Sequence, residues 1–144
     1  MIFIGMKSRD YWINVGMESG FDDEYSAGEH LDHILDIIDD LPQDVILYRV
    51  VYLDSLSDLD KLKPGTHYVL NKKSLMRNHY LNDIVDSHSM GETPYIITVK
   101  VDKSKVDVNL TIDNNMRYPN EEEISLKNKG KGSIITKIEK LGRN

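Results

Sequence analysis

The stretch Val45-Ile46-Leu47-Tyr48-Arg49-Val50-Val51-Tyr52-Leu53 decides the fold. Its residues are mostly β-branched, aromatic or otherwise apolar, which favours an extended backbone, and Arg49 carries its only charge. A short apolar run of this kind is typical of a strand with little exposure to water. We therefore predict a largely buried strand over residues 45–53.

The segment before this strand predicts an amphipathic helix over residues 26–41. Ser26 and Glu29 have the spacing of a capping box, in which each side chain accepts a bond from a backbone N–H at the start of a helix. Apolar residues then recur at helical spacing, at Leu31, Ile34, Leu35, Ile38 and Leu41. Pro42 ends the pattern because proline cannot continue the hydrogen bonds of a helix.

Strand-like segments dominate the rest of the chain. We predict strands over residues 66–70, 95–101, 106–112, 124–126 and 133–141, a helical turn over 56–62 and a helix over 74–85. Because helices come first and strands later, the order indicates an α+β fold rather than a doubly wound α/β fold. The length of 144 residues fits a single domain, residues 1–144.

Composition excludes several functional classes. A net charge of −6 gives no basic surface for duplex nucleic acid. The chain has no cysteine, which excludes disulfides, thiolate metal sites and a thiol nucleophile. No stretch approaches the ~20 apolar residues of a membrane span, and the amino-terminal residues lack the pattern of a secretory signal. We expect a cytoplasmic protein with no membrane partner.

The acidic stretch Tyr118-Pro119-Asn120-Glu121-Glu122-Glu123-Ile124-Ser125-Leu126 is the strongest chemical signal. In an extended backbone, Glu121 and Glu123 face one space together and Glu122 turns away. Two carboxylates in one cleft can divide labour between stabilising positive charge and accepting a proton. The alternative interpretation is an exposed acidic turn before an edge strand.

Arg49 is the second chemical signal. A guanidinium inside an apolar strand is costly to bury without a partner. One interpretation is an ion pair with one of the many carboxylates of this chain. The other is a guanidinium held to bind a phosphate or carboxylate, which its planar fork does well.

Together these stretches resemble a known family. Residues 47–141 are similar, in order, to the mono-ADP-ribosyltransferases of the arginine-serine-glutamate class, which include bacterial toxins and phage enzymes. Leu47-Tyr48-Arg49 resembles the first core strand of that family, and Glu121-Glu122-Glu123 resembles its Glu-x-Glu motif. The closing segment Ile134-Ile135-Thr136-Lys137-Ile138 is similar to its last strand.

The resemblance implies a fold and an activity. The fold would be a split β core of mixed or antiparallel sheets around a cleft for NAD, which serves as the substrate. Arg49 and Tyr48 would bind the NAD phosphates and line the cleft, while Glu123 would stabilise the positive charge that develops on the ribose. Glu121 would activate the acceptor, expected to be an arginine of a target protein in a bacterial cell or a phage-infected host.

The middle motif of that family is only partly present. Where the family has Ser-Thr-Ser, this chain has Val69-Leu70-Asn71-Lys72-Lys73-Ser74-Leu75. Ser74 and Asn71 are the polar residues predicted to line the site. Lys72 falls near the first serine position, where it would form an ion pair with Glu123.

Two other functions follow from these departures. A catalytically inactive protein on the same scaffold would act as a protein-interaction module. A third alternative is an enzyme that hydrolyses NAD without an acceptor. We predict no metal site, because His30 and His33 on the first predicted helix have no further ligand-rich segment to complete one.

Overall fold

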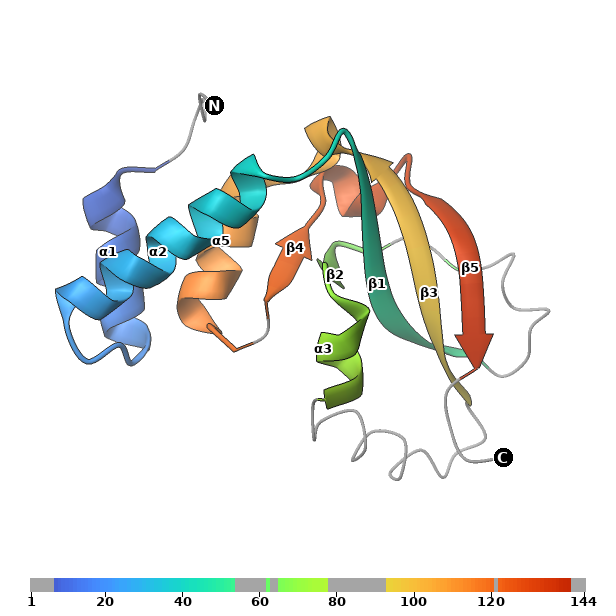
Figure 1. Ribbon diagram of the computed structural model, residues 1–144, viewed down its shortest axis with the longest axis horizontal. Helices are drawn as coiled ribbons and strands as arrows, with labels where there is room; N and C mark the ends of the chain where they lie inside the picture. The colour runs from blue at the N-terminus through green and yellow to red at the C-terminus, as the bar shows by residue number, and fades with distance from the viewer. Residues whose placement is uncertain (1–6, 54–61, 63–64, 78–92, 121, 141–144) are drawn as a thin grey trace.

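The computed structural model describes residues 7–53, 62, 65–77, 93–120 and 122–140. It has an α+β fold (Figure 1), as the order of the elements predicted. Its helices are α1 (Arg9–Ser19), α2 (Glu24–Asp39), α3 (Lys72–Arg77) and α5 (Val108–Arg117). Two short 3₁₀ helices are η2 (Lys103–Lys105) and η3 (Lys127–Gly130). The strands are β1 (Asp44–Leu53), β2 (His67–Val69), β3 (Thr93–Asp102), β4 (Glu123–Ser125) and β5 (Ile134–Lys140).

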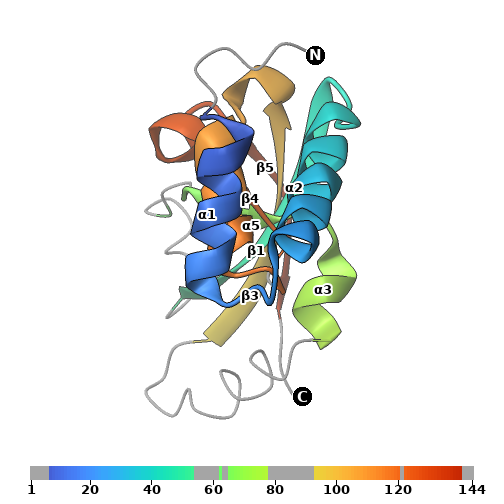
Figure 2. The same cartoon turned by 90° about the vertical axis from the view of Figure 1, so that its left-hand side faces the viewer.

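Helices α1, α2 and α5 group at one end of the molecule and contact one another (Figure 1). Figure 2 shows α1 and α2 on the near side, with α5 behind α1. Their shared core consists of Trp12, Val15, Ala27, Leu31, Ile34, Ile38, Ile112 and Met116. Asp23, rather than the predicted Ser26, caps α2, because its carboxylate accepts a hydrogen bond from the N–H of Ser26.

The strands form one five-stranded antiparallel sheet in the order β4-β2-β1-β3-β5. Tyr48 on β1 is opposite Val69 on β2, and Val69 is opposite Glu123 on β4. β1 and β3 pair along their whole length, from Asp44 opposite Asp102 to Leu53 opposite Thr93. The described strands thus belong to a single antiparallel sheet.

Directly opposed residues in neighbouring strands lie on the same face of a sheet, and successive residues alternate between faces. We call one side the core face; it carries Val45, Leu47, Arg49, Val51, Tyr68, Tyr95, Ile97, Val99 and Ile124. Apart from Arg49, these side chains are buried in the second hydrophobic core. We call the other side the cavity face; it carries Tyr48, Val50, Val69, Ile96, Thr98, Glu123 and Glu139.

Several predicted elements are confirmed, with shifts at their ends. β1, β3, β4 and β5 match the predicted strands at 45–53, 95–101, 124–126 and 133–141, and β2 lies within 66–70. The predicted helix at 74–85 begins earlier, as α3, and its residues beyond 77 lie outside the described part. The predicted turn at 56–62 also falls almost wholly outside it.

The predicted strand over residues 106–112 is wrong, because this segment enters helix α5. Asp107 caps the helix by accepting a hydrogen bond from the N–H of Leu110. The residues that α5 buries follow helical spacing: Thr111, Ile112, Asn115 and Met116. Helix α1 was not predicted from the sequence either.

Candidate functional site

Glu123 begins the edge strand β4, where helix α5 fixes its backbone. The Asn115 side-chain amide donates a hydrogen bond of 2.7 Å to the carbonyl of Glu123, and Thr111 Oγ1 accepts one of 3.0 Å from the N–H of Ser125. Both α5 side chains are buried. The Glu123 side chain is 24% exposed, and its Oε2 lies 3.4 Å from Nδ1 of His67 on β2. The carboxylate is thus held at a fixed place and stays accessible.

Glu123 lines a cavity of about 680 Å³, which we call the carboxylate cavity. Helix α2, the end of β2 and the turn before β4 supply its walls. Its polar lining comes from His30, His33, Asn71, Thr111, Asn115, Asn120, Glu122 and Glu123. Phe21, Ile34, Ile37, Ile38, Leu70, Pro119 and Ile124 supply the apolar lining. The volume is in the range of small-molecule sites.

His30 lines this cavity with a partly buried imidazole. Burial lowers the pKa of its imidazole, and a hydrogen bond to the carbonyl of Asn115 opposes that shift. Its Nε2 lies 3.0 Å from that carbonyl oxygen, and its ring contacts Phe21 with centroids 5.3 Å apart. The imidazole therefore favours the neutral form and gives the cavity a flat, partly apolar wall.

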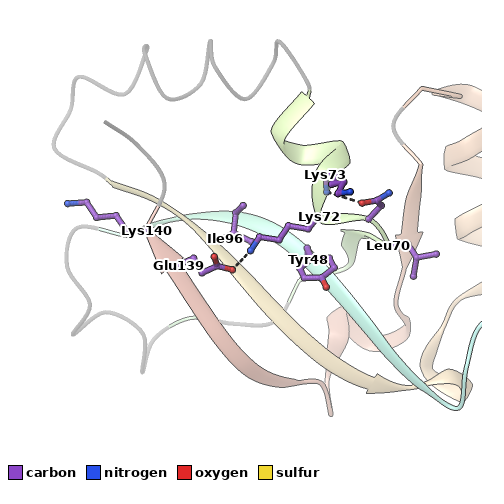
Figure 3. Close-up of a pocket in the computed structure, with 8 residues that line it drawn as sticks. Tyr48, Leu70, Lys72, Lys73, Ile96, Glu139 and Lys140 are labelled. Atoms are coloured by element: carbon purple, nitrogen blue, oxygen red, sulfur yellow. Dashed lines mark hydrogen bonds and ion pairs between the residues drawn. The ribbon is translucent and has the colours of Figure 1, made fainter. Parts of the chain in front are cut away.

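A second cavity, of about 840 Å³, adjoins the first; we call it the lysine cavity (Figure 3). Leu70 and Asn71 line both. The other lining residues are Tyr48, Lys72, Lys73, Ile96, Glu139 and Lys140. Figure 3 shows Lys72 reaching from α3 to form an ion pair with Glu139, while the Lys140 side chain extends away from the other lining residues. Lys72 lowers the pKa of Glu139, which keeps that carboxylate charged.

Arg49 does not join this site. It is opposite Ile97 on β3, on the core face, whereas Glu123 is on the cavity face. Its guanidinium lies over the ring of Tyr68 with Cζ 5.7 Å from the centroid, and beside Gly65. The strand pairing therefore does not support the prediction that Arg49 and Glu123 line one pocket. The physical reason is strand register, which puts Tyr48 rather than Arg49 on the same side as Glu123.

The geometry predicted for the three glutamates is also corrected. Glu122 has φ of 50°, so the chain is not extended there and the alternation assumed for residues 121–123 does not hold. As a result Glu122, which was expected to turn away, lines the carboxylate cavity together with Glu123. Glu121 lies outside the described residues.

The remaining predicted residues divide between the two cavities. Asn71 lines both, and Tyr48 lines the lysine cavity. Ser74 belongs to α3, and its side chain lies outside the described part. Lys72 pairs with Glu139 and not with Glu123, which pairs with His67 instead.

His67 and His30 are the site residues that the sequence did not indicate. His67 is an isolated histidine, and His30 was considered only with His33 as a metal ligand; neither segment has a catalytic signature. For His67 the available signal was its spacing in a predicted strand. It precedes Val69 by two residues, so the two side chains lie on the same face, and Val69 is opposite Glu123.

No group of three His, Asp or Glu side chains in the described residues could hold a metal ion. None of the described helices is both long and apolar enough to cross a membrane. Comparison of the chain with protein-family models, with curated proteins and with solved structures found no match.

Proposed function

We propose that this chain is a mono-ADP-ribosyltransferase that moves ADP-ribose from NAD to a side chain of a target protein. The position of Glu123 carries the proposal. Its partly buried carboxylate lines a cavity of about 680 Å³ that adjoins a second one of about 840 Å³ at Leu70 and Asn71. Two adjoining cavities suit a dinucleotide, whose halves need separate but connected spaces.

The charges of the two cavities complement those of NAD. The nicotinamide ring of NAD is cationic, and the carboxylate cavity presents Glu122 and Glu123 beside the flat rings of Phe21 and His30. The diphosphate is anionic, and Lys72 and Lys73 line the other cavity. Opposite charges at short range favour this orientation over the reverse one.

The chemistry needs one well-placed carboxylate. When the bond between C1′ of the ribose and the nicotinamide nitrogen breaks, the electron pair leaves with nicotinamide and positive charge develops on the sugar. Glu123 would stabilise that charge. A nucleophilic side chain of the target then bonds to C1′ and releases a proton, so the products are nicotinamide, the ADP-ribosylated target and H⁺.

Two roles differ from those expected from the resemblance. Phosphate binding is assigned to Lys72 and not to Arg49, because Tyr48 and Lys72 share the cavity that adjoins the site of Glu123. Glu122 is the second carboxylate of the described cavity and would accept the proton of the nucleophile. Arginine remains the proposed acceptor, and of its predicted roles Glu121 would keep that of orienting the nucleophile.

The test is transfer of labelled ADP-ribose from NAD to proteins of a bacterial lysate. Glu123→Gln keeps the shape of the side chain and removes its charge, so transfer should fall at least about a hundredfold. Glu18→Gln, a matched change at an exposed position of α1, should leave transfer unchanged. Unaltered transfer by Glu123→Gln at an unchanged melting temperature would rule out the role given to Glu123.

A second function has one observation in its favour. Arg49 lies on the core face, away from Glu123, so the pair of residues that defines the resemblance is not assembled. This favours a catalytically inactive protein that binds a partner through its surface. Calorimetric titration with NAD separates the two functions, because the enzyme should bind NAD and the interaction module should show no heat at millimolar NAD.

A further inference from the structure

We propose that His67 is the positioning residue for Glu123, an inference that rests on the function proposed above. His67 and Glu123 lie on adjacent strands and on the same face of the sheet. Nδ1 of His67 is 3.4 Å from Oε2 of Glu123. Lys72, which occupies the sequence position expected for a partner of Glu123, forms its ion pair with Glu139. An imidazole from the neighbouring strand thus makes the contact with Glu123 that was expected of Lys72.

Nδ1 of His67 has three neighbours that compete for it. Besides Glu123, the side-chain amide of Asn114 lies 3.1 Å away and Oγ of Ser125 lies 3.3 Å away. A ring nitrogen either carries a hydrogen and donates, or presents a lone pair and accepts. It can therefore donate to Glu123 or accept from Asn114, but it cannot do both.

The donating state is favoured for two reasons. A hydrogen bond to a charged carboxylate is roughly twice as strong as one between neutral groups. Asn114 also has another acceptor, because its Nδ2 lies 3.0 Å from Oγ of Ser125. Because Asn114 can donate to Ser125, it does not need Nδ1 of His67 as an acceptor, and Nδ1–H can donate to Glu123 across 3.4 Å. The imidazole of His67 then helps to fix the direction of the carboxylate, whose backbone α5 already holds.

The same geometry excludes a hydrolytic triad. A serine-histidine-carboxylate relay needs the serine and the carboxylate on different ring nitrogens. Here Ser125 and Glu123 both face Nδ1, and Ser125 is fully buried. Ser125 therefore supports the arrangement as an acceptor and does not act as a nucleophile.

The contact can be tested without any activity, by ¹⁵N NMR of the imidazole at a pH where His67 is neutral. In the wild type the hydrogen should be on Nδ1. In Glu123→Ala, which removes the acceptor, the hydrogen should move to Nε2 so that Nδ1 can accept from Asn114. A hydrogen on Nε2 in the wild type, unaffected by Glu123→Ala, would overturn the proposal.

The positioning role can be tested by kinetics. His67→Ala should lower kcat about 10- to 100-fold, as for loss of one bond to a charged group, and leave KM for NAD within about twofold. His67→Asn should recover part of kcat, because its amide N–H can reach the place of Nδ1–H. His67→Leu, whose side chain has nearly the shape of Asn but no donor, should not recover kcat. Equal losses in Asn and Leu variants of unchanged melting temperature would overturn the positioning role.

The two proposals fail in different ways. If the wild type transfers no ADP-ribose while the hydrogen moves between ring nitrogens as predicted, the proposed function fails and the pairing of His67 with Glu123 stands. If transfer depends on Glu123 but not on His67, the proposed function stands and His67 has no positioning role.

Discussion

The two faces of the sheet differ in what their polar residues can reach. On the cavity face, Glu123 and Tyr48 adjoin the carboxylate and lysine cavities. On the core face, Arg49 lies over the ring of Tyr68 among buried apolar side chains. Tyr48 and Arg49 are neighbours in sequence, yet Tyr48 lines a ligand-sized cavity and Arg49 lies on the core face. Two motif residues on different strands of one sheet therefore come together only when they also lie on the same face.

The two tyrosines give the largest contrast between the faces. Tyr68 is 1% exposed, and its hydroxyl accepts a hydrogen bond from the N–H of Gly65, so Tyr68→Ala should destabilise the fold by about 3 kcal/mol or more. Tyr48 is only half-buried, so Tyr48→Ala should cost roughly 1 kcal/mol and mainly weaken NAD binding. Urea denaturation and calorimetry measure the two effects. Equal stability losses would remove the distinction between the faces.

Two cations on opposite faces give the next contrast. Lys72→Gln should weaken NAD binding roughly fivefold, because Lys72 lines the lysine cavity and is about one-third exposed. Arg49→Gln removes a cation from the core face and should leave the affinity nearly unchanged. The reverse order of effects in calorimetric titrations would return phosphate binding to Arg49.

His30 makes stability depend on pH on the side of the carboxylate cavity. Its pKa is lowered in the folded protein, so the unfolded chain takes up a proton first as the pH falls. Stability should therefore be complete above the ordinary histidine pKa of about 6.5 and decline below it.

His30→Gln keeps an N–H donor for the Asn115 carbonyl and removes the titrating group. Urea denaturation between about pH 5 and 8 should therefore show that the free energy of unfolding of this variant depends less on pH than that of the wild type. His33→Gln, one turn along α2, removes only a lesser cause of the lowered pKa of His30 and should flatten the profile less than His30→Gln does. A profile unchanged by His30→Gln would contradict the assignment.

Gly65→Ala should have the smallest effect. A methyl group there would lie 1.3 Å from Nη1 of Arg49, so the guanidinium must move. The end of an arginine side chain is flexible, and Arg49 is not assigned to the ligand. The equilibrium constants for unfolding and for NAD binding should each change by less than about twofold. A large loss of NAD affinity would show that the position of Arg49 matters for binding.

The sequence predicted the regular parts of this fold well, and it failed where local pattern and tertiary packing disagree. β1 and β3 have long apolar runs that only a strand satisfies. Residues 106–112 alternate between apolar and polar side chains, as a strand with one exposed face does. The Asp107 cap and burial at every third or fourth residue nevertheless make the segment helical from Val108. Alternation over seven residues cannot by itself distinguish these outcomes.

The candidate site was predicted only in part, for a related reason. Glu123 was identified from its neighbours in sequence, but the face that Arg49 occupies depends on pairing with strands far along the chain. The left-handed backbone at Glu122 changes which glutamates face the cavity, and nothing in three consecutive glutamates indicates where such a turn falls. His67 became visible only when β2 and β4 were paired.

NMR titration of the wild-type protein with NAD would show which face binds the ligand. The Leu70 methyl groups and the Asn71 side-chain amide line both cavities, so their resonances should shift progressively and saturate. The guanidinium of Arg49 and the methyl groups of Ile97, on the core face, should remain nearly unchanged. Saturable shifts centred on Arg49, or no shifts at millimolar NAD, would contradict a binding site on the side of Glu123.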